Sequence, residues 1–169
     1  MPIQRLNHAV LYVRDAQRTA DFYRQVLGFR TVTELGGGKA VFLQAPGSRN
    51  DHDLGLFEVG AGAAASPAGR GSVGLYHLAW EVDTLGELAR VAEALQDAGA
   101  LVGASDHGTT KALYAHDPDG IEFEVSWLVP ADRVAEVAGG MTTRPLDLRA
   151  ELARWGADVE GGVGVSHAS

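Results

Sequence analysis

The stretches LNHAVLYV (residues 6–13) and LYHLAWEV (residues 75–82) share one pattern. Each has histidine at its third position and valine at its last, each has the apolar character of a β-strand, and each is followed by a helical pattern. Two such copies in one chain indicate an internal repeat. Such a repeat decides the architecture of the whole chain.

The residues after the first copy predict a helix and three further strands. Asp15 is suited to cap the helix at its start, and Gly28 is suited to end it. The apolar stripe between them has helical spacing and consists of Ala16, Ala20, Tyr23 and Leu27. The strand-like runs are residues 29–35, 39–45 and 53–59, and three glycines separate the first two as a hairpin turn would.

The residues after the second copy predict the same order of elements. TLGE (residues 84–87) matches a capping box, and Gly99 is suited to end the helix. The expected apolar stripe consists of Leu85, Leu88, Ala92, Leu95 and Ala98. The strand-like runs are residues 100–106, 111–117 and 121–127, with the turn DPDG (residues 117–120) between the last two.

Each half therefore reads as strand, helix and three strands, which predicts an α+β fold of two tandem βαβββ modules. The modules cover residues 5–60 and 74–128 of one domain, residues 1–130, and the small, turn-rich residues 60–72 join them. Residues 131–155 predict a short helical C-terminal extension, in which Pro145 suits a helix start. Residues 156–169 are expected to form a disordered tail.

Composition excludes several classes of function. The chain of 169 residues has no cysteine, so a metal would have to be bound by His, Asp or Glu. The net charge is −8 and no basic patch occurs, which argues against nucleic acid and anionic membranes as partners. The sequence contains no apolar run long enough to span a membrane, and its start does not resemble a signal peptide, so a cytoplasmic protein is expected.

His8 and His77 occupy equivalent positions in the two copies, and a paired repeat would bring them together. Glu124 lies in the last predicted strand between two apolar residues, where a carboxylate needs a cation. Glu122, nearer the turn, is expected at the rim of the site. Two histidines and one carboxylate form the facial triad of non-haem Fe(II) oxygenases. Zn(II), Mn(II), Co(II) and Ni(II) could use the same ligands.

These residues resemble the vicinal oxygen chelate superfamily, which includes glyoxalase I, bleomycin and fosfomycin resistance proteins, and type I extradiol ring-cleaving dioxygenases. The matching pieces are NHAVLYV, YHLAWEV and DPDGIEFEV, within residues 5–127. The resemblance implies two modules that form a cupped mixed β-sheet around a metal held by His8, His77 and Glu124. It also implies a homodimer or a higher homo-oligomer.

Three further residues resemble catalytic positions of the extradiol dioxygenases. His52, in DHDLGLF (residues 51–57), matches the histidine that opens the last strand of the first module and acts as acid and base. Tyr114, ten residues before Glu124, matches a tyrosine that bonds a catechol oxygen. His107 matches a supporting histidine, although its spacing to Tyr114 is shorter than in the family. The resemblance thus implies Fe(II), a small aromatic diol and O2.

Two alternatives remain open at the level of sequence. Glu58 lies near the end of the first module, where glyoxalase I supplies a fourth metal ligand. Four protein ligands would favour a glyoxalase-type metallo-isomerase or lyase. The second alternative is a non-enzymatic drug-binding resistance protein, which would need no catalytic metal; the two histidines and Glu124 argue against it.

Overall fold

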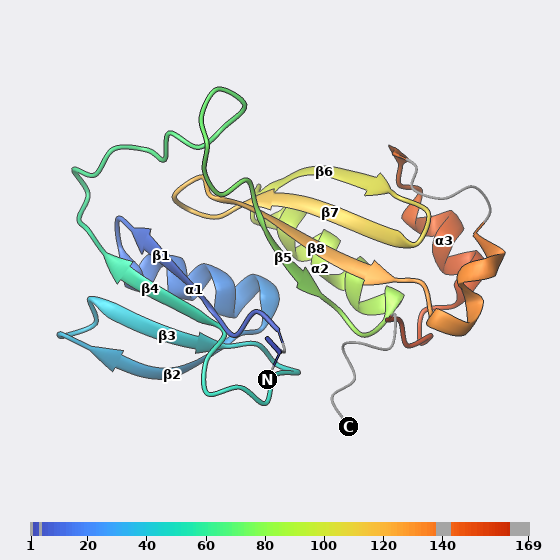
Figure 1. The fold of residues 1–169 in the computed structure, drawn as a ribbon, viewed down its shortest axis with the longest axis horizontal. Coiled ribbons are helices and arrows are strands. Elements are labelled where there is room, and N and C mark those ends of the chain that lie inside the picture. The colour runs from blue at the N-terminus through green and yellow to red at the C-terminus, as the bar shows by residue number, and fades with distance from the viewer. Residues whose placement is uncertain (1, 4, 138–142, 163–169) are drawn as a thin grey trace. The chain divides into compact units, whose positions relative to one another are not determined.

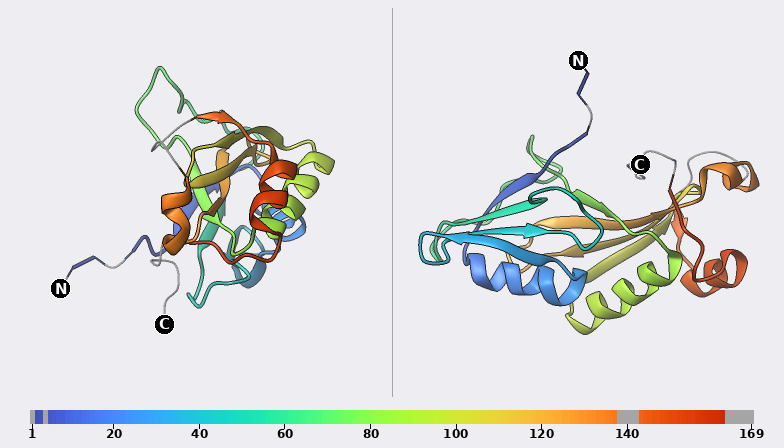
Figure 2. Two further views of the ribbon diagram at one scale, coloured as in Figure 1. Left: turned by 90° about the vertical axis from the view of Figure 1, so that its right-hand side faces the viewer. Right: turned by 90° about the horizontal axis from the view of Figure 1, so that it is seen from below.

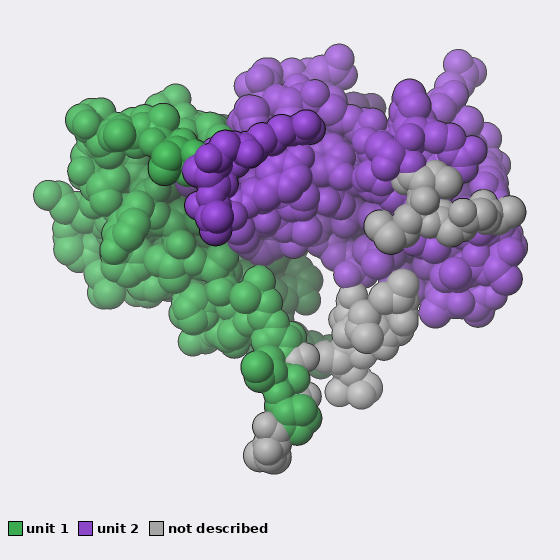
Figure 3. Space-filling view, turned by 45° about the horizontal axis from the view of Figure 1, so that its top comes forward, with its two compact units in different colours: residues 1–67, 117–120 green, residues 68–116, 121–169 purple. Residues whose placement is uncertain are grey.

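Each half of the chain forms one β-sheet in the computed structural model, which describes residues 2, 3, 5–137 and 143–162 (Figure 1). The two compact units do not follow the sequence strictly: the first comprises residues 1–67 and 117–120, and the second comprises residues 68–116 and 121–169 (Figure 3). Mixed sheets with a few helices confirm the predicted α+β class, and both halves have the βαβββ order.

The first unit is a four-stranded sheet with the strand order β1-β4-β3-β2. Its outer strand β1 runs parallel to β4, whereas the other pairs are antiparallel. One helix, α1, covers one face of the sheet (Figure 2). The elements are β1 (Ala9–Val13), α1 (Ala16–Leu27), β2 (Arg30–Leu35), β3 (Ala40–Gln44) and β4 (Leu54–Glu58).

Local signals in the sequence account for the bounds of α1. The side chain of Asp15 accepts a hydrogen bond from the backbone N–H of Arg18 at 2.9 Å, as an N-cap should. Gly28 ends the helix with a φ of 73°, a left-handed conformation that glycine adopts without a steric penalty. The four residues of the predicted stripe are all buried against the sheet.

The second unit repeats this arrangement with the strand order β5-β8-β7-β6-β9. Again the first strand of the module, β5, runs parallel to the last, β8, and α2 contacts the sheet. The elements are β5 (Leu78–Glu81), α2 (Leu85–Asp97), β6 (Leu101–Asp106), β7 (Thr110–His116), β8 (Glu122–Leu128), the 3-10 helix η1 (Ala131–Glu136), β9 (Arg144–Pro145) and α3 (Leu148–Trp155).

The start of α2 confirms the predicted cap, because Thr84 accepts a hydrogen bond from the Glu87 N–H at 3.2 Å. Its apolar face differs in detail from the prediction. Val91 is buried and belongs to the face, whereas Ala98 is exposed because it follows the last helical turn. No helix in the described part of the chain combines the length and the apolar character needed to cross a membrane.

The first strand of each module is shorter than predicted. β1 begins at Ala9 and β5 at Leu78, so His8 and His77 each stand immediately before a strand rather than inside it. In the first module the partner strand accounts for this, because Ala9 pairs with Leu54, the first residue of β4. In the second module, Leu78 pairs with Phe123, the second residue of β8. Both histidines lie at the end of a sheet where a pair of parallel strands begins.

The C-terminal extension packs on the second unit. Pro145 does not start a helix as predicted; it pairs with β6 in the short strand β9, and Asp147 caps α3 instead. Lys111 of β7 is only 1% exposed and pairs with Asp106 at 2.6 Å and with Glu151 of α3 at 3.2 Å. Such a buried cation needs both carboxylates, since an unpaired charge is costly to bury.

Residues 156–162, which the sequence places in a disordered tail, instead make backbone hydrogen bonds with the second unit. Glu160 forms an isolated bridge with Thr84, and the N–H of Gly161 donates to the carbonyl of Asp83 at 2.7 Å. The remaining part of the predicted tail, residues 163–169, lies outside the described residues.

Candidate active site

In the first unit, two histidines lie side by side where β1 and β4 begin. The rings of His8 and His52 have centroids 4.5 Å apart. His8 is exposed, whereas His52 is half-buried and its ring also lies edge-on against Phe42, with centroids 5.1 Å apart. The pairing of β1 with β4 explains this, because parallel neighbours start at the same edge of a sheet.

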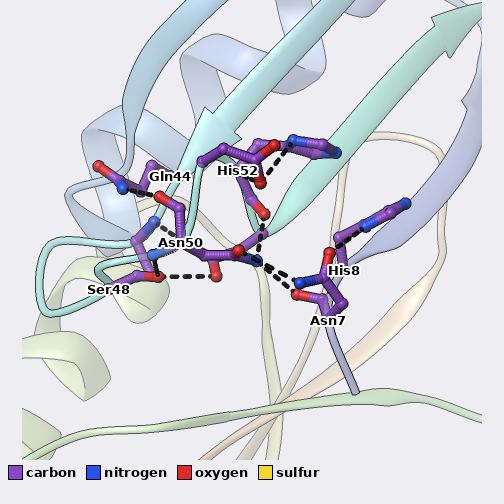
Figure 4. A network of polar contacts seen from close by, with 9 residues as sticks. Asn7, His8, Gln44, Ser48, Asn50 and His52 are labelled. Atoms are coloured by element: carbon purple, nitrogen blue, oxygen red, sulfur yellow. Dashed lines mark hydrogen bonds and ion pairs between the residues drawn. The ribbon is translucent and has the colours of Figure 1, made fainter. Parts of the chain in front are cut away.

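Each histidine of this pair has a polar neighbour next to it in sequence. Nδ1 of His8 lies 2.7 Å from Oδ1 of Asn7, and Nδ1 of His52 lies 3.3 Å from a carboxylate oxygen of Asp51 (Figure 4). The pKa of Asp51 lies below its usual value, chiefly because its carboxylate accepts the backbone N–H of His52. Asp51 is therefore a carboxylate at neutral pH.

In the second unit, His77 meets the predicted ligand Glu124. Nε2 of His77 lies 3.3 Å from Oε2 of Glu124. Two ligands bound at about 2.1 Å to one metal ion at right angles would be separated by about 3 Å. Nδ1 of His77 is buried and has no hydrogen-bond partner among the described residues; its nearest carboxylate, that of Glu122, is 3.7 Å away. Nε2 of His77 and Oε2 of Glu124 therefore have a separation that fits two ligands of one divalent metal ion.

Tyr114 lies directly opposite Glu124 in the pairing of β7 with β8, so the two side chains share one face of the sheet. Its hydroxyl is 2.9 Å from Nε2 of His107, because the tight turn from β6 to β7 folds His107 back towards it. Burial raises the pKa of the Tyr114 phenol, and the negative charge of Glu124 raises it further. The phenol therefore keeps its proton at neutral pH.

The register of the two parallel strand pairs identifies equivalent positions in the two modules. The residue after His8 pairs with Leu54, and the residue after His77 pairs with Phe123. The next residue of each partner strand is Gly55 in β4 and Glu124 in β8. The first module thus has a glycine where the second has its carboxylate.

The same register places Glu58 away from that position. Side chains alternate along a strand, so Glu58 points to the opposite face from Gly55. Leu54 and Leu56, which share the face of Glu58, are fully buried on the side covered by α1. At Gly55, a side chain would meet Phe42 and Val10 at 3.5 Å, which is ordinary contact.

The structure thus brings together two subsets of the predicted site. His8 and His52 meet in the first unit, and His77, Glu124, Tyr114 and His107 meet in the second. Within the described residues, no group of three or more His, Cys, Asp or Glu is close enough to hold a metal ion. The ligand set of His8, His77 and Glu124 draws on both units and stays a prediction.

The remaining polar residues near the last turn have other partners. His116 lies 3.7 Å from Glu122 and takes no part in either subset. Asp119 belongs to the first unit, where it accepts a hydrogen bond from the guanidinium of Arg14 at 2.8 Å and another from the Arg14 backbone at 3.1 Å. Asp119 therefore serves the turn and its ion pair with Arg14 and belongs to neither subset.

The sequence prediction missed two asparagines. Asn7 contacts the ring of His8, and Asn50 donates hydrogen bonds to the carbonyls of both Asn7 and His52. The position of Asn7 directly before His8 was a signal that could have been used. Asn50 gave no such signal, because its role depends on a loop that returns to the start of β1.

Comparison with known proteins shows which family model and which relatives match the chain. The model of the family described as "Glyoxalase/Bleomycin resistance protein/Dioxygenase superfamily" matches residues 5–125. Catechol-2,3-dioxygenase from Bacillus subtilis (strain 168) is 32% identical over 71% of this chain and 40% of its own length. Metapyrocatechase 2 from Cupriavidus necator is 30% identical over 92% of this chain and 45% of its own. The chain thus spans less than half the length of these two relatives.

A shorter relative and two solved structures match more completely. Biphenyl-2,3-diol 1,2-dioxygenase 2 from Rhodococcus globerulus is 30% identical over 79% of this chain and 68% of its own length. A glyoxylase/bleomycin resistance protein/dioxygenase domain from Frankia sp. EAN1pec has a TM-score of 0.66 at 21% identity, covering 80% of this chain and 99% of its own. A lactoylglutathione lyase from Agrobacterium tumefaciens has a TM-score of 0.55 at 25% identity, covering 75% and 95%.

Proposed function

Because the chain belongs to the glyoxalase/bleomycin resistance protein/dioxygenase superfamily, we propose that it is an extradiol dioxygenase. It would open the ring of a small catechol-type diol with O2 at an Fe(II) ion held by His8, His77 and Glu124. Three relatives at about 30% identity carry the names of catechol or biphenyl-diol dioxygenases or of a metapyrocatechase, which supports this class. Fe(II) suits the proposed ligand set of two histidines and one carboxylate.

The glycine at position 55 is the observation that favours a dioxygenase with three protein ligands over a metallo-isomerase with four. A metal with four protein ligands would require a carboxylate in β4 at the position equivalent to Glu124, and that residue has no side chain. Glu58, the candidate fourth ligand, points to the other face of β4. A set of three protein ligands would leave coordination positions of the ion open, as the chemistry of this class requires.

Side chains of this protein would supply the hydrogen bonds to the substrate and the acid–base chemistry. A bound Fe(II) would supply open coordination positions and lower the pKa of a coordinated hydroxyl. The Tyr114 hydroxyl, protonated at neutral pH, would donate a hydrogen bond to a diol oxygen. His107 would donate from Nε2 to the oxygen of Tyr114, 2.9 Å away, while its Nδ1 would accept from the Thr143 hydroxyl at 3.4 Å. His52 would accept and return a proton as acid and base.

Oxygen consumption tests the proposal directly. The protein is loaded anaerobically with Fe(II), its iron content is measured, and a panel of mono- and bicyclic catechols is added in aerated buffer. We expect uptake of one O2 per diol and a yellow ring-opened semialdehyde. Full iron occupancy without turnover of any diol would refute the dioxygenase assignment. Isomerisation of a hemithioacetal under the same conditions would assign the protein to the metallo-isomerases instead.

A further inference from the structure

We propose that Asn7 and Asn50 are positioning residues that set which nitrogen of His8 is free to bind a metal. Together they hold the proton of the neutral imidazole on Nδ1 and leave the lone pair on Nε2. The metal-binding part of this inference rests on the proposed function, whereas the position of the proton does not. All the contacts involved lie within the first unit (Figure 4).

The orientation of Asn50 follows from its partners. Its Nδ2 lies 2.8 Å from the backbone carbonyl of Asn7 and 2.7 Å from the backbone carbonyl of His52. Carbonyl oxygens can only accept hydrogen bonds, so the atom facing both of them must be the amide nitrogen. The other atom of this amide, Oδ1, is therefore an acceptor, and it faces the side chain of Asn7.

The orientation of Asn50 determines that of Asn7, and Asn7 determines which nitrogen of His8 carries the proton. Oδ1 of Asn50 can only accept, so the atom of Asn7 that lies 3.2 Å from it must be the donor Nδ2. This leaves Oδ1 of Asn7 facing Nδ1 of His8 at 2.7 Å. An amide oxygen has no proton to give, so Nδ1 of His8 carries the hydrogen and Nε2 carries the lone pair. A partner of this kind on the other nitrogen orients the ring of a metal-binding histidine.

Asn50 is itself fixed by hydrogen bonds, so it can orient Asn7 and, through Asn7, the ring of His8. Its carbonyl accepts from the side chain of Gln44, and its N–H donates to the hydroxyl of Ser48 at 3.1 Å. That hydroxyl in turn donates to Asp53 at 2.8 Å. Because one amide bonds the backbone before β1 and the backbone before β4, it also fixes the spacing between the His8 and His52 backbones.

Nitrogen NMR of the metal-free protein tests where the proton is. The 15N shifts of the His8 ring, assigned by comparison with a His8→Gln variant, are read above the pH at which the ring is protonated. We expect the wild type and Asn7→Asp to carry the proton on Nδ1, because both keep an acceptor there. Asn7→Leu should shift the ring towards the Nε2-protonated form, and Asn50→Ala should give an intermediate mixture. A wild-type ring with its proton on Nε2 would overturn the proposal.

Co(II) binding, followed by absorption spectroscopy, tests the consequence for the metal. Loss of a partner that orients a histidine ligand typically weakens metal binding about 10- to 100-fold. We expect a loss of this size for Asn7→Leu and smaller losses for Asn50→Ala and for Asn7→Asp, because Asn7→Asp keeps the acceptor for His8 and loses only the donor to Asn50. Equal affinity of Asn7→Leu and the wild type would contradict the proposal, as would a loss in Asn7→Asp as large as in Asn7→Leu.

Thermal unfolding of the metal-free variants provides the matched control. Asn7 is exposed, so its replacement should leave the midpoint close to that of the wild type. A large shift in the midpoint of Asn7→Leu would assign the loss of Co(II) binding to folding and would overturn the positioning role. Failure of the wild type to cleave any diol would refute the dioxygenase proposal but would leave the NMR and Co(II) results for Asn7 intact.

Discussion

At the scale of single residues, Tyr114 has the surroundings of a hydrogen-bond donor that must stay protonated. Burial and the carboxylate of Glu124 both raise the pKa of its phenol, and His107 fixes its oxygen at 2.9 Å. The hydrogen bond to His107 fixes the direction in which this hydroxyl can donate. The arrangement therefore favours a role for the hydroxyl itself.

We expect Tyr114→Phe to lower kcat/KM for diol cleavage, because the variant keeps the ring and loses only the hydrogen bond to the substrate. A hydrogen bond to a charged group contributes about 1.5–3 kcal/mol, so the loss should be roughly 10- to 150-fold. Oxygen uptake by Fe(II)-loaded protein measures the rate, and the iron content of each sample is determined in parallel. Wild-type activity in this variant would remove Tyr114 from the mechanism.

A double-mutant cycle separates the role of His107 from that of Tyr114. If His107 acts only through the tyrosine hydroxyl, His107→Phe should reduce kcat/KM on its own but add little to Tyr114→Phe. Additive losses would mean that His107 contacts the substrate or the metal independently. Loss of iron in either variant would mean instead that the change acts on the metal site.

At the scale of elements, local signals sufficed for much of the fold. Asp15, Gly28 and Thr84 act through neighbours within one helical turn, so the sequence alone located both long helices. The strand ends were less predictable, because they depend on where a partner strand begins. Pro145 was misassigned for the same reason: its place is set by pairing with Ser105 of β6.

The candidate site shows the same limit. The repeated pattern located two histidines that each stand directly before a strand, and Tyr114 and Glu124, ten residues apart, form a direct cross-strand pair. The significance of Gly55 could not be read from the sequence, because it emerges only when the registers of β1 with β4 and of β5 with β8 are compared.

Gly55→Glu should convert the proposed three-ligand site into one with a fourth carboxylate. The new side chain would begin in ordinary contact with Phe42 and Val10, 3.5 Å away, so the strand should tolerate it. We expect Gly55→Glu to retain metal and to lose diol cleavage by roughly 100-fold, the scale on which a single mispositioned group can disturb a reacting geometry. Oxygen uptake and metal content measure the two effects.

Gly55→Ala is the matched control for this substitution. It introduces the same Cβ into the same contacts without a carboxylate, so its activity should stay within about threefold of the wild type, as expected for a change of less than about 0.7 kcal/mol. Equal losses in the two variants would show that Gly55 is needed for close packing against Phe42. Full activity of Gly55→Glu would mean that the glycine at this position in the strand register does not decide between three and four protein ligands.

At the scale of the whole molecule, the proposed ligands divide between two units that each have their own sheet and helix. His8 belongs to the first unit, whereas His77 and Glu124 belong to the second. Residues 60–72, small and turn-rich, connect the modules. A metal ion bound by the proposed ligands would stabilise the folded chain, since an ion that binds only the native state shifts the unfolding equilibrium.

Metal-dependent stability therefore tests whether both units contribute ligands. At a free Co(II) concentration of about 100 times its dissociation constant, the folded state should gain about 2.7 kcal/mol. For a chain of 169 residues this corresponds to a rise in Tm of roughly 5–10 °C. We expect His8→Gln, in the first unit, and Glu124→Gln, in the second, each to abolish most of this rise, measured by scanning calorimetry with and without metal. His116→Gln, a change at a histidine outside both subsets, should leave it intact. A full rise in His8→Gln would mean that the second unit binds the metal without the first, and the shared site would have to be abandoned.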